Sequence, residues 1–348
     1  MNNKCCESIK NCSSSEPKHV ETVSTNLSMT DIIGGWKARW GIGRMKYIIN
    51  PGLYAVGNPN NESPVLVSAN YKLTFDTLRK NLKGLNCWIL ILDTKGINVW
   101  CSAGKGTFCA EEIVKRIESS ELSNYVSHKK LILPQLSAPG VNAHKVKSSS
   151  GYSVNYGTVR AEDIKEYIRA GNIATKEMKT VQFNLWDRLV LTPMELLPAL
   201  KKALPIFGIM LLSNTFLRKP FDGKDVLSLT SSIVSGAVIT PAFLPYIPGN
   251  AFAIKGWLVG LGITAGVLGM TGRFNKENSL LTLGHLILFP AISSFLAMNF
   301  TGSSTYTSPT GTLKEVKKAI PIIIGSVVIG GIITLAVHLL DKRSTNEA

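Results

Sequence analysis

The chain has 348 residues, which at roughly 150 residues per domain suggests about two domains. Hydrophobic residues make up 45% of it and charged residues only 18%, whereas an ordinary soluble domain carries roughly 25% charged residues. The mean hydropathy of +0.15 excludes an intrinsically disordered chain, because such chains have low hydrophobicity. Six cysteines are too few for a disulfide framework and favour a reducing compartment.

The net charge is +15, and the basic residues are spread along the whole chain. Residues 1–200 hold 25 Lys and Arg against 17 Asp and Glu, and residues 201–348 hold 13 against 6. A nucleic-acid-binding protein would gather its basic residues in a patch or stripe. The even distribution therefore predicts no nucleic acid partner and favours attraction to an anionic membrane lipid surface.

Residues 1–30 are polar, rich in Ser and Thr and without the apolar segment of a signal peptide, so we expect a disordered N-terminal tail. Its Cys5, Cys6 and Cys12 lack the spacing of an iron–sulfur site.

Residues 31–192 alternate β-rich runs with amphipathic helical runs, which is typical of an open α/β layer. The run CWILILD is apolar for six residues before Asp93 and predicts a strand buried on both faces. We therefore predict an α/β, Rossmann-like domain here. The expected strands are 64–69, 87–93, 130–136 and 153–159, and the expected helices are 75–82, 110–118 and 162–170.

From residue 193 onward, five apolar stretches follow, each of about 20 residues, the length that crosses a hydrocarbon core of ~30 Å. They predict an all-α, five-helix transmembrane domain over 193–348 rather than the buried helices of a soluble protein. The N-terminal domain has no export signal, so we expect it in the cytoplasm, with the chain in the cytoplasmic membrane and the C-terminus outside. The expected spans lie near 198–217, 226–247, 251–270, 279–300 and 319–340.

The most informative segment is DTKGINVWCSAGKGTF, residues 93–108. After the buried strand we expect an extended run at 98–101, and then a helix from about Ala110 that Thr107 caps. Gly104 and Gly106 permit close approach of the backbone to a ligand. The carboxyl end of a sheet beside a helix N-terminus is where open α/β proteins bind ligands.

Two other interpretations of this segment are a nucleotide-binding loop and a structural cysteine. A nucleotide-binding P-loop, G-x-x-x-x-G-K-[ST], is not predicted, because Val99 replaces its first glycine and Gly106 its Ser or Thr. Cys101 taken alone could be a structural thiol. However, it stands in a polar turn flanked by glycines, whereas Cys87 lies within the apolar strand.

The sequence NVWCSAGKGTF resembles the cap-helix signature of the mercury-methylating corrinoid protein family, N-[VI]-W-C-A-[AS]-G-K. Ser102 replaces the usual Ala of that family. The similarity extends to PGLYAVGNP, SPVLVSANYKLTFDTLR, LPQLSAPGVNAHKV and YGTVRAEDIKEYI and covers about residues 36–340. The corrinoid domain of the corrinoid iron–sulfur protein large subunit is more distantly similar.

This resemblance implies a corrinoid-dependent methyltransferase that transfers a methyl group from cobalt to Hg(II), giving methylmercury. The cofactor would be a cobamide (cobalamin) in the base-off state, with Cys101 as the lower axial cobalt ligand and catalytic residue. A thiolate opposite the methyl group favours its release with the electron pair, which the electrophile Hg(II) requires. The implied corrinoid contacts are Asn98, Val99, Trp100, Cys101, Ala103, Gly104, Lys105, Gly106 and Thr107, with Ser68, Thr74, Leu136 and Gly140.

Two alternatives stay open. One is a corrinoid methyl carrier of one-carbon metabolism with another acceptor, and the other is a five-span transporter or scaffold with a cytosolic regulatory domain. Because the sequence has no cluster motif, reduction of cobalt requires a ferredoxin-like partner with two [4Fe–4S] clusters. The methyl group would come from a methyl donor protein or the methyl-tetrahydrofolate pathway.

Overall fold

A computed structural model describes residues 20–216 and 221–346, so that Cys5, Cys6 and Cys12 lie outside the described residues. The chain divides into two compact units. The sheet unit contains the residues up to Gly35 and Gly43–Thr180, and the helical unit contains Trp36–Ile42 and the residues from Val181 onward. Each unit is described by itself.

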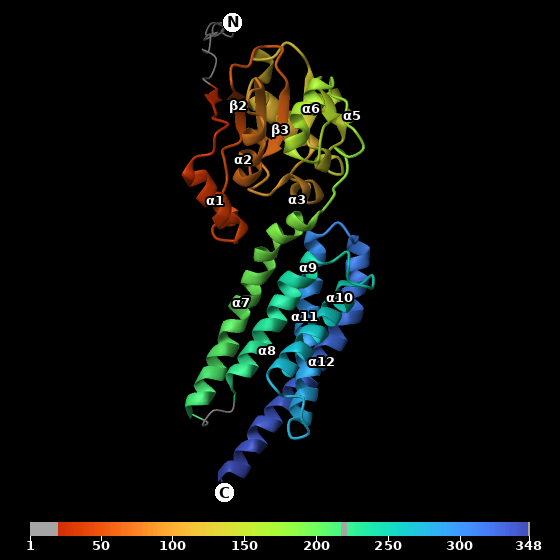
Figure 1. The fold of residues 1–348 in the computed structure, drawn as a ribbon. Helices are drawn as coiled ribbons and strands as arrows, with labels where there is room; N and C mark the ends of the chain where they lie inside the picture. Colours follow the sequence, from red (N-terminus) through yellow and green to blue (C-terminus); the bar gives the residue numbers. More distant parts are fainter. Residues whose placement is uncertain (1–19, 217–220, 347–348) are drawn as a thin grey trace, which may run out of the picture. The chain divides into compact units, whose positions relative to one another are not determined.

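The sheet unit contains a six-stranded sheet in the order β1-β2-β4-β3-β5-β6 (Figure 1). Strand β2 pairs antiparallel with β4, and the other pairs are parallel. The four strands expected from the sequence are β3 to β6, so the mainly parallel α/β sheet is confirmed. The strands are β1 (Glu21–Thr22), β2 (Gly52–Val56), β3 (Val65–Ala69), β4 (Cys87–Leu92), β5 (Lys130–Leu133) and β6 (Ser153–Tyr156).

Helices cover both faces of this sheet, which explains the continuous apolar run in β4. Along β4, Ile89 and Ile91 pack toward α2 (Lys72–Asn81) and α6 (Ile164–Arg169). Trp88, Leu90 and Leu92 belong to the core of the opposite face. That face is covered by α3 (Val99–Gly104), α4 (Ala110–Ser119) and α5 (Ala143–Ser150).

The predicted tail is too long at its C-terminal end. Glu21–Thr22 forms β1 beside β2, and α1 (Met29–Arg39) begins before residue 30. Local sequence does not reveal these elements, because a two-residue strand owes its form to the neighbour with which it pairs. Strand β2 was missed for a similar reason, since its residues GLYAV lie between glycines and carry no alternation.

A buried network of charges joins α1 to α2. Asp31 accepts from Lys72 Nζ at 2.5 Å and from Arg79 Nη2 at 2.7 Å. Both cations also pair with Asp76, and Arg79 donates to the carbonyl oxygen of Ser24. The hydrogen bonds from Lys72, Ser28 and Arg79 outweigh the opposing effect of burial and hold the pKa of Asp31 well below its usual value.

Among the described residues, the helical unit provides four helices that are long and apolar enough to cross a membrane, by length and composition. They cover Gly223–Ala242, Phe252–Met270, Ser279–Gly302 and Thr310–Leu340. Helix α7 (Leu185–Phe216), which contains the first expected span, is not among them: it carries Lys201, Lys202 and three prolines. The five-span prediction is therefore supported for four spans. The helices are α8 (Gly223–Val234), a π-helical turn η5 (Ser235–Ile239), α9 (Thr240–Ala242), α10 (Phe252–Met270), α11 (Ser279–Asn299) and α12 (Pro309–Asn346).

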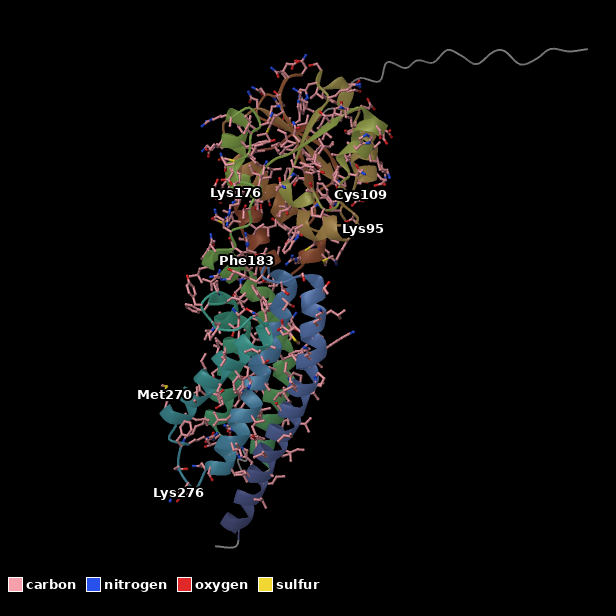
Figure 2. All side chains as sticks on the ribbon, turned by 90° about the vertical axis from the view of Figure 1, so that its right-hand side faces the viewer. Lys95, Cys109, Lys176, Phe183, Met270 and Lys276 are labelled. Atoms are coloured by element: carbon pink, nitrogen blue, oxygen red, sulfur yellow. The ribbon has the colours of Figure 1, made fainter. Side chains whose placement is uncertain are left out.

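Small residues let α10 and α11 approach closely, as is usual between membrane helices. A Cβ atom on Gly256 would meet Ala297 Cβ at 2.4 Å, and one on Gly260 would meet Ser293 Cβ at 2.6 Å. Ser293 Oγ also donates to the Gly256 carbonyl at 2.8 Å. Figure 2 marks Met270 at the end of α10 and Lys276 in the connection from α10 to α11.

We predict that Asp31→Asn lowers the free energy of unfolding of the sheet unit by roughly 1–2 kcal/mol at pH 7, because Lys72 and Arg79 lose a charged acceptor. The pKa of Asp31 is lowered in the folded chain, so this stabilisation is present above the unfolded pKa, near 4, and is lost as the pH falls through the folded pKa. Wild type and variant should therefore converge in acid. Denaturant titrations at several pH values measure this; Glu111→Gln, which breaks an exposed pair with Lys145, is the control without a measurable effect.

Candidate functional site

The candidate site lies at the carboxyl edge of the sheet, at the point where the chain reverses direction across it. From β3 the chain crosses by α2 to β4 on one side, and from β4 it crosses by α3 and α4 to β5 on the other side. The crevice outside the carboxyl ends of strands at such a switch point is where open α/β sheets bind ligands. Here it lies between the ends of β3 and β5.

Asn70, which directly follows β3, holds the connection between β4 and α3. Its side-chain oxygen accepts from Thr94 N at 3.1 Å, from Thr94 Oγ1 at 2.9 Å and from Gly96 N at 2.9 Å. Its side-chain nitrogen donates to Asp93 Oδ1 at 3.3 Å, and the residue is 3% exposed. Sequence reasoning missed Asn70, although an Asn directly after an apolar strand is a signal of such a turn.

The expected extended run at 98–101 is wrong, because Val99–Gly104 forms the helix α3. Asn98 is its N-cap, and the Asn98 side chain accepts from Cys101 N at 3.0 Å. An Asn in this position favours a helix start over an extended strand. Cys101 is therefore the third residue of a short helix whose start is fixed by a side chain.

Helix α3 presents two faces. Val99, Ser102 and Ala103 are buried, and Val99 and Ala103 belong to the hydrophobic core. Trp100 is 41% exposed, and Cys101, Gly104 and Lys105 are exposed as well. The structure thus divides the predicted contact residues: the exposed set can meet a ligand, whereas Val99 and Ala103 seat the helix on the sheet.

Ser102 shows why a serine is compatible with this helix. Its hydroxyl donates to the Val99 carbonyl at 2.9 Å, so that the buried polar group is satisfied within α3 itself. The Ser102 carbonyl in turn accepts from Thr107 N at 3.0 Å and Phe108 N at 3.2 Å. Thr107 therefore helps to end α3. The prediction that it caps the following helix is wrong, because Cys109 is the N-cap of α4.

The three glycines of the predicted site differ in their surroundings. A Cβ atom on Gly104 or Gly106 would have no atom within 4 Å, and Gly106 has φ +74°. On Gly140, by contrast, it would lie 2.6 Å from the Ala103 carbonyl oxygen and 2.8 Å from that of Phe108. The backbone at Gly140 thus packs directly against the backbone of Ala103 in α3 and supports that helix. At Gly104 and Gly106, by contrast, there is free space beside the backbone.

The remaining predicted residues fall into two groups. Leu136 lies in the 3₁₀ turn η3 (Gln135–Ser137), which contacts α3. Ser68, 2% exposed in β3, shares the strand face of Leu66, which packs toward α2. Thr74 lies in the first part of α2. The structure therefore brings Leu136 and Gly140 to α3, and it places Ser68 and Thr74 on the other side of the sheet.

Cys87, the first residue of β4, and Cys101 on α3 have opposite environments. Cys87 is fully buried in β4, and burial raises the pKa of its thiol to about 12. Such a thiol is protonated and inert at neutral pH. Cys101 is exposed on α3, so it is the one of this pair that a ligand can reach.

Comparisons with known proteins match this same unit. Residues 44–168 match the family described as CO dehydrogenase/acetyl-CoA synthase delta subunit. The acetyl-CoA decarbonylase/synthase complex subunit gamma of Methanopyrus kandleri is 32% identical over 122 residues, 34% of this chain and 26% of that protein. Its counterpart from Methanocaldococcus jannaschii is 32% identical over 149 residues, 42% of this chain and 27% of that protein. The chain thus spans about a quarter of the length of these curated relatives. The family match over residues 44–168 includes the carboxyl-edge site and no part of the helical unit.

We predict that Gly140→Ala destabilises the sheet unit by about 1–3 kcal/mol, because the new methyl group overlaps the backbone of Ala103 and Phe108. Gly104→Ala should leave stability unchanged or raise it slightly, since its Cβ enters open space. Thermal and urea unfolding of the two variants measures the difference. Equal stability of both would contradict the role of Gly140 as a support of α3.

Proposed function

We propose that the chain is a membrane-anchored corrinoid protein that transfers a methyl group from cobalt, with Cys101 as the lower axial ligand. The observation that carries this proposal is the exposed Cys101 on a capped helix at the switch point of an open α/β sheet. The cap-helix resemblance of residues 98–105 and the family match over residues 44–168 both support it.

The residues of the site fit a large planar cofactor. The exposed face of α3 offers an indole, a thiol and an ammonium group from Trp100, Cys101 and Lys105. Gly104 and Gly106 leave open space beside the backbone. The amide and carboxylate groups around a corrin ring are suitable partners for Lys105 and for backbone N–H groups.

Each residue of the site has a separate role in this proposal. A bound corrinoid would supply cobalt chemistry for methyl transfer. Cys101 would be its thiol ligand, while Asn98 fixes the start of the helix that carries Cys101 and Asn70 fixes the turn before that helix. Val99 and Ala103 keep α3 against the core and so fix the side of the helix on which the thiol is exposed.

The acceptor separates two versions of the proposal. The comparisons favour a methyl carrier of one-carbon metabolism, because the relatives are subunits of acetyl-CoA decarbonylase/synthase complexes. The thiol ligand favours Hg(II) as acceptor: a thiolate strengthens electron donation to the methyl group, which then leaves with its bonding electron pair for the electrophilic metal ion. Methylmercury is the product in that version.

The remaining partners follow from the same chemistry. Cobalt must be reduced before it accepts a methyl group, and a ferredoxin-like protein with two [4Fe–4S] clusters would supply the electrons. The methyl donor would be a protein or a methyl-tetrahydrofolate. The apolar helices would anchor the chain in the cytoplasmic membrane with the sheet unit in the cytoplasm. A transporter or scaffold without a corrinoid is the competing class, and it would show no cobalt absorption.

We predict that Cys101→Ala retains most corrinoid binding, because many contacts hold the ring, but alters the cobalt absorption spectrum and abolishes methylation of Hg(II). Cys101→Thr should behave in the same way, because a hydroxyl is a much poorer donor than a thiolate. Purified protein reconstituted with cobalamin gives the spectra. Membranes of a deletion strain complemented with each variant, normalised to protein level, give the methylation rate.

Cys87→Ala is the matched control, and it should cost about 1 kcal/mol in stability with activity per folded molecule unchanged. If Cys101→Ala methylated Hg(II) at the wild-type rate, the proposed role of the Cys101 thiolate would be wrong. A wild-type protein that binds cobalamin and transfers methyl only to a one-carbon acceptor would establish the first version instead. A protein that stays colourless after reconstitution would remove both.

We further propose five crossings, with α7 as the first. Its residues Ala203 and Met210 are buried against α8 and α11, and 32 residues at about 1.5 Å each exceed the thickness of a hydrocarbon core. A reporter fused after Ala348 should then be extracytoplasmic, and one fused at residue 30 cytoplasmic. Reporters on the same side would mean that α7 does not cross.

A further inference from the structure

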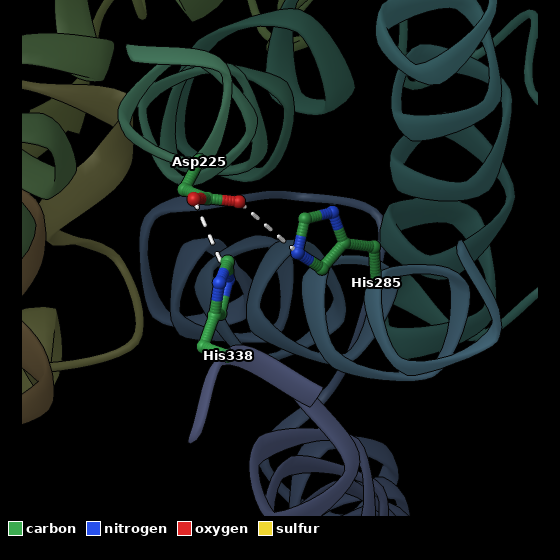
Figure 3. Close-up of side chains that lie close together, drawn as sticks. All are labelled: Asp225, His285 and His338. Carbon is green, nitrogen blue, oxygen red and sulfur yellow. Dashed lines mark ion pairs between the residues drawn. The ribbon is translucent and has the colours of Figure 1, made fainter. Parts of the chain in front are cut away.

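Three metal-binding side chains from three different helices converge inside the helical unit. Asp225 comes from α8, His285 from α11 and His338 from α12 (Figure 3). His285 Nε2 lies 3.5 Å from Asp225 Oδ1, and His338 Nε2 lies 3.5 Å from Asp225 Oδ2. One ligand atom from each residue lies within 4.8 Å of the others.

The two imidazoles point their Nε2 atoms at the carboxylate without a hydrogen bond. Both Nε2 atoms are buried, and their contacts with Asp225 at 3.5 Å are too long or poorly aligned to count as hydrogen bonds; His285 is 0% exposed. Satisfying a polar group this weakly in an apolar interior is costly. A separation of 3.5 Å is long for a hydrogen bond, but it is close to the edge of about 3.4 Å that separates two ligand atoms of a tetrahedral zinc ion.

The surroundings add further polar groups that lack partners. Thr334 lies one turn before His338 on α12 and packs beside Gly284, the neighbour of His285. Its buried hydroxyl has no hydrogen-bond partner either. Thr334 Oγ1 is therefore a further buried polar atom without a hydrogen-bond partner, one helical turn from His338.

A charged lid of Arg273 and Asp222 closes the cluster at the ends of the helices. Arg273 donates to Asp225 Oδ1 at 2.5 Å and to Asp222 Oδ1 at 2.7 Å. With both imidazoles neutral, two carboxylates face one guanidinium, so these groups together carry one negative charge. This negative charge favours the binding of a cation. Asp222 is half-exposed, so the buried cluster lies directly beneath a residue at the surface.

We propose that Asp225, His285 and His338 bind a divalent transition metal ion of the zinc class. Two imidazoles and one carboxylate are a ligand set that zinc accepts, with a fourth position left for water. Nothing in the proposed corrinoid chemistry uses these residues, so the site is a separate one. Its ion would tie α8, α11 and α12 together at one end of the helical unit.

Binding requires one rearrangement of protons. Arg273 Nη1 lies 3.5 Å from His285 Nδ1, and because a guanidinium can only donate, this contact favours the tautomer with its proton on Nε2. When the ion binds Nε2, that proton moves to Nδ1, so that the imidazole stays neutral and the long contact with Arg273 is lost. Arg273 keeps its two carboxylate partners, so the lid stays closed.

The test uses the full chain in detergent, free of corrinoid and treated with a chelator. Zinc is added, unbound metal is removed, and the zinc per chain is counted by mass spectrometry. We expect Asp225→Asn, His285→Gln and His338→Gln each to bind one zinc ion fewer than wild type. His144→Gln, an exposed histidine of α5, is the matched control and should bind as many as wild type.

Melting temperatures with and without zinc separate loss of the site from loss of the fold. Zinc should raise the melting temperature of wild type and of His144→Gln by several degrees, and it should not raise that of the three variants. X-ray absorption spectroscopy of the zinc-loaded wild type needs no variant. The spectrum should show two imidazole ligands for each zinc ion bound in the cluster. Zinc bound by sulfur alone, or an unchanged zinc count in His338→Gln, would overturn the proposal. If the melting temperature depended on pH but not on zinc, the cluster would bind a proton and not a metal ion, and the proposal would be wrong.

Discussion

The turn that Asn70 holds between β4 and α3 is the constraint on which the candidate site depends. One buried amide satisfies three donors of that turn, so the chain leaves the sheet in a single direction. Asn98 then caps α3, and the core contacts of Val99 and Ala103 fix its rotation. The exposure of Cys101 is therefore a consequence of buried groups on either side of it. A cysteine in a free loop would sample many positions, whereas a ligand of a large rigid cofactor needs one.

The sequence allowed prediction of the layers of the sheet unit because their signal is local. A strand buried on both faces must be apolar throughout, and Cys87–Leu92 is. The parts that sequence reasoning missed depend on distant partners: β1 exists through its pairing with β2, and the Asn98 start of a helix competes with an extended run of similar local preference. The motif residues of the site can be predicted from the sequence, but which of them are exposed cannot. That division depends on the rotation of α3 against the core, which only packing decides.

The helical unit shows the same difference between composition and placement. Apolar stretches of sufficient length reveal four helices that can cross a membrane, and their bounds agree with the expected spans to within a few residues, except for the last, which starts earlier. The sequence does not predict that the histidines in these stretches act together, because each is alone in its own segment. Asp225, His285 and His338 are separated by 60 and 53 positions in the chain, and only the packing of α8, α11 and α12 brings them together. Ionisable groups within apolar helices are costly, which makes a functional reason for such a cluster stronger than for the same residues on a surface.

The comparisons and the cap helix bear on different halves of the proposed reaction. The family match over residues 44–168 covers the sheet and its carboxyl edge, and therefore bears on what the proposed site binds. The identity of the lower ligand concerns the direction in which electrons move when the methyl group leaves. Under the proposal, a chain could share the first property with its relatives and differ from them in the second. The proposed preference for Hg(II) therefore rests on the chemistry of one exposed side chain, Cys101, while the buried contacts of α3 account for how that side chain is held in place.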